Sequence, residues 1–282
     1  MWSARGLDLD RVWQDTIVRL RGFRNPDEWT IGRDSQPFDN FFLFDQAVMW
    51  VAALHASAAQ AIRLKPPELS VQQWEALHAL TFRMIEQLDA IRILFLTDLP
   101  TPSMQIARSI SEDVDMALAF IARPKLAKRF VECTTTDEAN EFWRRHIAGG
   151  RAFKVVSEQL YRAGLEFDQS GEYAAWRRQV GAILGSAVHT SFRPARIESI
   201  GAPGQFSETN DCLYFVTLRL QEMCAYSHGL GSDFGQDLAA VSRMDQSSTD
   251  GGLSKLTPLI SEITLAQLRW TIEAGASQVV PA

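Results

Sequence analysis

The sequence is poor in cysteine, and its cysteines follow no disulfide or metal pattern. Cys133, Cys212 and Cys224 form no C-x-x-C pair and leave an odd count. Cys212 and Cys224 are expected on one helix, where about 18 Å would separate them, too far for a disulfide. A reduced, cytoplasmic protein is therefore expected.

Long apolar runs are also missing. Residues 47–54 form the most apolar run, which is far shorter than the roughly 20 residues needed to cross a bilayer. The first ten residues contain no apolar signal region. These observations predict that the chain does not interact with a membrane.

Familiar catalytic and cofactor motifs are absent. The chain has no G-x-S-x-G turn, no phosphate-binding loop and no zinc constellation. A single Glu-x-x-His unit, Glu75 to His78, falls short of the two copies that helical di-metal sites use. We therefore expect neither a metal nor a cofactor.

Apolar residues recur with the 3.6-residue period of helices, and no alternating strand pattern is found. The sequence predicts an all-α, multi-helix bundle of mostly antiparallel long helices. Residues 1–245 are expected to form one bundle domain, with 246–252 as a linker and 253–282 as a C-terminal helix packing on it. Helices are expected at residues 7–23, 38–64, 70–97, 101–123, 124–132, 135–165, 171–192, 207–228 and 256–276.

Three caps support these boundaries. Ser70 with Gln73 and Thr135 with Glu138 match the capping box, in which the two side chains bond free amides at a helix start. Thr101 before Pro102 predicts a third helix start. The pair Gly149–Gly150 allows a kink within 135–165.

Charge is distributed unevenly. The chain has a net charge of −6, which argues against a protein that coats nucleic acid generally, yet residues 123–154 have a net charge of +4. Lys125 and Arg129 lie in this basic stretch and are candidate binding residues. The alternative is an ordinary solvated helical face.

The first polar cluster is Arg108, Glu112 and Asp115, spaced i, i+4 and i+7 beside the expected core stripe of residues 101–123. Turned inward, Arg108 could bind a phosphate or carboxylate while Glu112 orients it. The alternative is a helix-surface ion pair worth about 0.2–0.5 kcal/mol.

The second cluster lies on the helix expected at 171–192. Its less apolar face contains small residues between Arg178 and His189, and Gly181 and Gly185 suggest a close approach by another group. His189 could transfer a proton beside the hydroxyls of Ser186 and Ser191. The alternative is a histidine that bonds the last carbonyls of its helix.

Together the clusters read R-x-x-x-E, residues 108–112, followed by S-x-x-[hydrophobic]-H-x-S, residues 186–191. With the segment 119–130, they resemble an all-helical bacterial domain-of-unknown-function family over about residues 40–230. That family is similar to the HEPN superfamily, whose better-known members are metal-independent ribonucleases of toxin and antiviral systems. HEPN proteins place R-x(4–6)-H in one helix. Here residues 182–188 contain no arginine, so Arg108 would supply the charge from another helix.

The resemblance implies an RNA-binding or RNA-cleaving effector of a bacterial defence or toxin system. Arg108 would stabilise phosphate charge, Glu112 would orient Arg108, and His189 would transfer the proton. The alternative is a non-catalytic helical module that senses a ligand or binds a protein partner or a second copy. Either function predicts that the helices bearing Arg108 and His189 lie side by side, with Arg108 contacting Glu112 and His189 within one water molecule of that pair.

Overall fold

The computed structural model describes residues 36–97, 99–162, 172–188, 209–230, 232–244 and 252–277. The described residues contain helices and no strand, which confirms the all-α prediction. The helix expected at 7–23 lies outside them, as do His189 and Ser191 and the side chain of Ser186.

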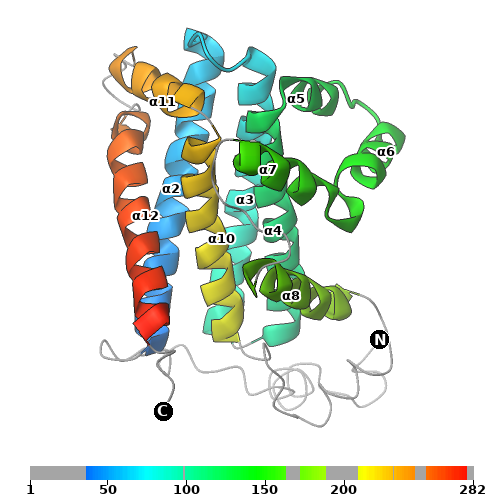
Figure 1. The fold of residues 1–282 in the computed structure, drawn as a ribbon, viewed down its shortest axis with the longest axis vertical. Coiled ribbons are helices and arrows are strands. Elements are labelled where there is room, and N and C mark those ends of the chain that lie inside the picture. Colours follow the sequence, from blue (N-terminus) through cyan, green and yellow to red (C-terminus); the bar gives the residue numbers. More distant parts are fainter. Residues whose placement is uncertain are drawn as a thin grey trace, which may run out of the picture.

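Five long helices form the bundle (Figure 1). Helix α2 packs against α3, α10 and α12, and α4 packs against α3 and α10 on the other side. The core between them contains the buried aromatic side chains of Phe44, Trp50, Trp74 and Phe120. The five helices are α2 (Gln36–Leu64), α3 (Val71–Leu96), α4 (Pro100–Ala122), α10 (Thr209–Gly229) and α12 (Gly252–Ser277).

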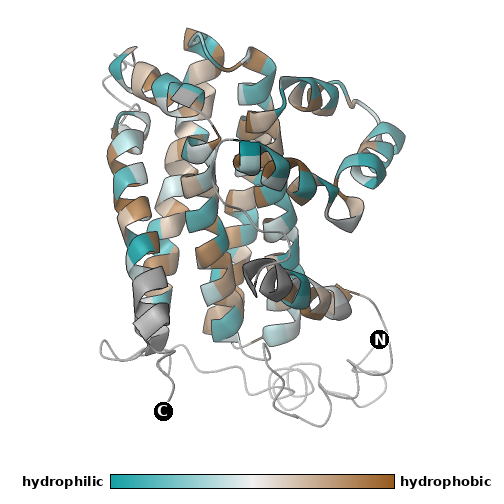
Figure 2. Ribbon diagram, in the orientation of Figure 1, coloured by the Kyte–Doolittle hydropathy of each residue, from teal (hydrophilic) through white to brown (hydrophobic). Residues whose placement is uncertain are grey.

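Shorter helices surround this bundle. Helices α7 (Arg151–Arg162) and α8 (Glu172–Val188) both pack against α4, whereas α11 (Ser232–Met244) contacts α2, α10 and α12. The segments α5 (Pro124–Val131) and α6 (Thr136–His146) form an arm beside the bundle (Figure 1). Most of α6 is hydrophilic (Figure 2), in keeping with an element that buries only Phe142.

Both capping boxes occur as predicted, at Ser70 with Gln73 and at Thr135 with Glu138. The predicted cap at Thr101 is wrong. Helix α4 begins at Pro100, and its N-cap Leu99 makes no side-chain capping bond. Proline suits the first helical position because its fixed φ is helical and the missing N–H would be unpaired there.

Two glycines divide the helix predicted at 135–165. Gly149 and Gly150 have φ values of 70° and 73°, and the 3-10 turn η4 (Ala148–Gly150) separates α6 from α7. L-residues rarely adopt these left-handed conformations, so the glycines end the helix where a kink alone was predicted.

The C-terminal region differs from its prediction in two respects. Helix α11 was missed, and α12 begins at Gly252, inside the expected linker. Residues 246–251 lie outside the described part. Phe234, Leu238 and Val241 give α11 an apolar side that is buried in the bundle. Tertiary contact therefore stabilises a short helix whose own sequence contains a glycine, Gly235.

Residues 40–64 of α2 are long and apolar enough to cross a membrane, which the short run at 47–54 did not predict. The same segment packs against three long helices and α11. Trp50, Val51 and Leu54 are fully buried there. A central core helix has this apolar composition as well, and these contacts place α2 in the core.

Candidate functional site

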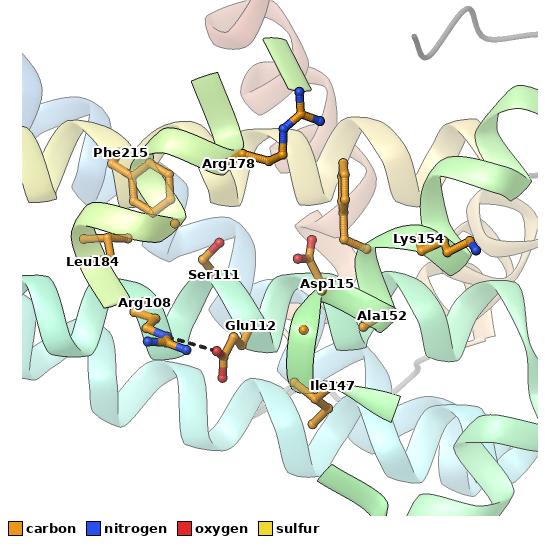
Figure 3. A pocket seen from close by; sticks show the side chains of 14 residues that line it. Arg108, Ser111, Glu112, Asp115, Ile147, Ala152, Lys154, Arg178, Leu184 and Phe215 are labelled. Atoms are coloured by element: carbon orange, nitrogen blue, oxygen red, sulfur yellow. Dashed lines mark hydrogen bonds and ion pairs between the residues drawn. The ribbon is translucent and has the colours of Figure 1, made fainter. Parts of the chain in front are cut away.

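Helix α4 lines a pocket of about 510 Å³ with a polar stripe (Figure 3). Arg108, Ser111, Glu112 and Asp115 recur every three or four residues, so they share one side of the helix. The other walls come from η4, α7, α8 and α10. The predicted stripe therefore lies against a pocket.

Arg108 and Glu112 form an ion pair at the pocket edge. The Arg108 Nε lies 3.2 Å from Glu112 Oε1, and the two side chains are 30% and 36% exposed. This contact confirms the predicted pairing. Because the pair is partly exposed, it is a weak source of stability and Arg108 remains accessible to a ligand.

Helix α8 approaches the same arginine. A Cβ built on Gly185 would lie 3.1 Å from Arg108 Nη1, which confirms that the glycine permits a close approach. No atom lies within 4 Å of a Cβ built on Gly181, although Gly181 lines the pocket. The predicted side-by-side arrangement of the Arg108 helix and the helix leading to His189 is therefore confirmed.

A buried arginine from α10 supports the pocket floor. Arg219 is 0% exposed and donates to Asp115 Oδ1 at 2.6 Å and to Ser111 Oγ at 3.2 Å. It also donates to Glu222, which is on its own helix. Burial, with Asp115 nearby, raises the pKa of Glu222 well above its usual value. Arg219 thus fixes two side chains that face the pocket.

Sequence reasoning missed this network. Arg219 and Glu222 are spaced i, i+3 in an otherwise strongly apolar helix, and this spacing was the available signal. Since Ser111 accepts from Arg219, its own hydroxyl hydrogen can point elsewhere. In Figure 3, Ser111 and Asp115 both project from α4 toward the pocket.

A second hollow, of about 520 Å³, shares the ion pair with the first. Its lining includes Arg108 and Glu112 together with Trp143, an indole that is 44% exposed. Gln105 also lines it and donates to the Ala187 carbonyl at 2.8 Å, which holds the end of α8. The ion pair is therefore common to both hollows.

The first pocket has aromatic walls and basic residues at its rim. Phe153 and Phe215 contribute rings, and Lys154 and Arg178 contribute cations. In Figure 3 the Lys154 and Arg178 side chains extend away from Arg108. Arg178 therefore borders the predicted site, whereas Arg108 lies on the same side of α4 as the polar floor.

The basic stretch is partly neutralised by ion pairs. Glutamates lie within 4.0 Å of Arg123, Lys128, Arg145 and Lys154. Lys125 and Arg129 are exposed, and neither has an ion pair with another described residue. The structure thus places these two predicted binding residues at the surface of α5, outside the pocket.

One histidine of the arm lies within the basic stretch. His146 packs against the Phe142 ring, with 4.8 Å between ring centroids. Burial lowers the pKa of His146, and the nearby arginines Arg129, Arg145 and Arg151 lower it further. Three arginines of the basic stretch therefore lie near His146.

Among the described residues, no group of three or more His, Cys, Asp or Glu side chains is placed to hold a metal ion. His78, from the lone Glu-x-x-His unit, stacks on His55 with 4.2 Å between ring centroids. Comparisons of the chain with models of known families, with curated proteins and with solved structures found no match.

Proposed function

We propose that the protein binds single-stranded RNA across α4, with one phosphodiester at Arg108 and a base in each flanking hollow. The observation behind this proposal is that the Arg108–Glu112 pair lines both hollows. A nucleic-acid strand has the same order of groups, since each phosphate joins two nucleosides. A phosphate at Arg108 would therefore have one base on either side of it. Both hollows fall within the 300–1,000 Å³ typical of small-ligand sites.

Arg108 suits the phosphate for two reasons. Its guanidinium is planar and keeps its charge, and it can bind two phosphate oxygens at once. The contact with Glu112 uses Nε, and the Nη1 nitrogen lies near Gly185. The close approach of α8 thus restricts the guanidinium to the boundary between the hollows.

Aromatic side chains suit the bases. Trp143 lines one hollow, and Phe153 and Phe215 line the other. Stacking of a base on an aromatic ring contributes about 1–3 kcal/mol and depends little on sequence. The polar floor of Ser111 and Asp115 offers a hydroxyl donor and a carboxylate acceptor to the edge of a base.

Fluorescence anisotropy with a labelled ten-nucleotide oligouridine tests the proposal. Arg108→Ala is expected to raise Kd at least tenfold, and Trp143→Ala at least fivefold. Arg92→Ala is the matched control, because Arg92 is an exposed arginine paired with Asp45 away from both hollows. An oligonucleotide that does not bind, or one that Arg92→Ala weakens as much as Arg108→Ala, contradicts the proposal.

A second candidate function is sensing of a small anionic ligand, and the concave shape of the first pocket favours it. Its polar floor and aromatic walls could receive a single nucleotide. A thermal shift with uridine monophosphate, absent with uridine and reduced by Arg108→Ala, would support this function. Lack of oligouridine binding in the same preparation would select it over the RNA proposal.

Cleavage of the bound RNA is the catalytic form of the first proposal. The ribose 2′-oxygen would attack phosphorus, the bond to the 5′-oxygen would break, and a 2′,3′-cyclic phosphate would form. His189 would transfer the proton, Arg108 would stabilise the charge, and Glu112 would orient Arg108. His189 directly follows Val188, which lines the second hollow.

The cleavage assay uses a mixed RNA pool in the presence of EDTA. His189→Ala and Glu112→Gln are each expected to reduce the rate at least a hundredfold while changing oligouridine Kd less than threefold. Purified protein that neither shifts nor cuts RNA would reject both binding and catalysis. Binding without cleavage would leave the non-catalytic form.

A further inference from the structure

Helix α12 exposes large apolar side chains and buries small polar ones. On the side facing the bundle, Ser254, Thr257, Ser261 and Thr264 are buried. Thr257 Oγ1 donates to the Ala53 carbonyl, and Ser261 Oγ accepts from Trp50 Nε1, each at 3.1 Å. These bonds fix the rotation of α12 on α2, so its outward side is well determined.

The outward side forms a continuous apolar stripe. Four of its large apolar side chains are about half exposed: Leu256 (48%), Leu259 (53%), Ile263 (45%) and Trp270 (57%). Ala266 is exposed as well. Apolar residues are visible along this helix in Figure 2, and in that view no other helix of the described residues covers it. Soluble helices ordinarily place such residues inward, and a continuous exposed stripe indicates an interaction surface.

The spacing of the stripe is that of a coiled coil. The spacing between successive stripe residues alternates between three and four, which is the a/d pattern of the heptad repeat. The stripe residues are at positions 256, 259, 263, 266 and 270. This pattern favours a partner helix that lies nearly parallel or antiparallel to α12. Lys255, Glu262 and Arg269 fall at the flanking g positions.

We propose that the stripe, residues 256–270 of α12, pairs with the same stripe of a second copy in antiparallel orientation. In the register that places Ile263 opposite Ala266, Leu259 lies opposite Trp270. Ile263 and Trp270 then each meet a smaller side chain. The same register brings Glu262 of each copy beside Arg269 of the other, forming two equivalent ion pairs.

The charges select this arrangement over its alternatives. Shifting the antiparallel register by one heptad in either direction brings Glu262 beside Glu262, or Arg269 beside Arg269, of the other copy. A parallel pairing would set g positions against e positions, where Ile260 and Gln267 provide no opposite charge. Like charges in contact are destabilising, so one register is preferred.

A membrane surface suits the stripe less well than a second copy does. Helices that lie on membranes have basic polar faces, whereas the g positions alternate Lys, Glu and Arg. The helix is already folded on α2, so pairing requires no helix nucleation. Two heptads are a small interface, and a dimer in the micromolar range of Kd is expected.

Sedimentation equilibrium of the full chain tests the pairing. Glu262→Arg and Arg269→Glu are each expected to raise the dimer Kd at least tenfold, since each places like charges together. The double exchange E262R/R269E restores the pairs and should return Kd to within threefold of the original. Lys255→Glu is the control and should change Kd less than twofold, because the g position that faces Lys255 in this register is Ala276, which has no charge.

A chain that stays monomeric up to about 100 μM would overturn the proposal, since that concentration is well above a micromolar Kd. A dimer that none of the charge variants weakens, or one that the double exchange fails to restore, would overturn it as well. Co-sedimentation of monomeric protein with phosphatidylserine vesicles, abolished by Ile263→Asp, would assign the stripe to a lipid surface instead.

Discussion

Two arginines on neighbouring helices, Arg108 of α4 and Arg219 of α10, have opposite environments. Arg219 is completely buried among Ser111, Asp115 and Glu222, whereas the Arg108 side chain is 30% exposed at the junction of two hollows. A buried charge must be paired, because the interior does not solvate it. The structural role therefore belongs to Arg219, and Arg108 is available for a ligand.

This contrast predicts different melting behaviour. Arg219→Met removes the buried guanidinium that donates to Asp115 and Glu222, and it should lower stability by about 3–5 kcal/mol. Arg108→Ala loses one partly exposed ion pair and should cost less than about 1 kcal/mol. Calorimetric melts of both variants measure the difference. Equal losses would mean that Arg108 is also a structural residue and would weaken the case for a site there.

Asp113 introduces a pH dependence of stability. It lies 3.4 Å from Arg83 Nε, and burial raises its pKa to about 7, although Arg83 and a hydrogen bond from Gln87 lower it. Because the pKa in the folded state exceeds that of the unfolded chain, the contribution of Asp113 is fully present below about pH 4. That contribution is lost as the pH rises toward 7.

Asp113→Asn should therefore melt at a higher temperature than the parent chain at pH 8. The gap should close as the pH falls toward 4, because the aspartic acid is then neutral in both states. Melts at half-unit pH intervals measure the gap. Asp89→Asn, an exposed change on α3, is the control and should leave the profile unchanged. A gap that is constant with pH would show that Asp113 is not responsible.

At the scale of elements, the turn η4 shapes the pocket by separating α6 from α7. Gly149 and Gly150 line the pocket, and no atom lies within 4 Å of a Cβ built on either one. The glycines are therefore required by their backbone conformation and not by crowding. A residue with a side chain at either position would favour a helix that continues through the turn.

Gly149→Ala and Gly150→Ala should each destabilise the protein by about 1 kcal/mol, because alanine is strained at positive φ. Gly181→Ala is the matched control. Gly181 is helical with open space around it, so alanine should stabilise the protein by up to about 1 kcal/mol. Urea denaturation gives all three values. Stabilisation by either turn substitution would contradict the left-handed geometry.

At the scale of the whole molecule, an acidic chain presents a basic surface on its projecting arm. The net charge is −6, but residues 123–154, which form α5, α6, η4 and the start of α7, have a net charge of +4. Both hollows are lined in part by residues of this stretch. A polyanion would therefore be attracted to the side of the molecule that contains Arg108.

Replacing Lys125 and Arg129 with glutamine should weaken oligoribonucleotide binding uniformly across sequences. It should also reduce the salt slope of log K by about one to two units, since each released phosphate contact lowers that slope. Anisotropy titrations between 50 and 200 mM salt measure the slope. Replacing Lys255 with glutamine on α12 is the control and should leave it unchanged. An unchanged slope in the double variant would identify the basic stretch as a solvated face only.

The all-α class and most helix positions followed from local information in the sequence. The hydrophobic period, the capping residues and the helix-breaking residues predicted bounds for α2, α3, α5 and α10 that are close to the observed ones. Each of these signals involves residues within a few positions of one another. Spacing alone also put Arg108 and Glu112 on one helix face, and Gly185 indicated a close neighbour. Local rules failed where tertiary contact prevailed, as in α11, which is stabilised by burying Phe234.

Only the tertiary structure decided which charges are structural and which line a pocket. Arg219 and Asp115 are more than a hundred residues apart, and no local pattern in the sequence indicates that they meet. The outward direction of Leu259 and Ile263 likewise depends on bonds between α12 and α2. The sequence by itself determined where most of the helices form, because that depends mainly on neighbours along the chain. The site and the exposed stripe depend on how those helices pack, because burial is a property of the whole molecule.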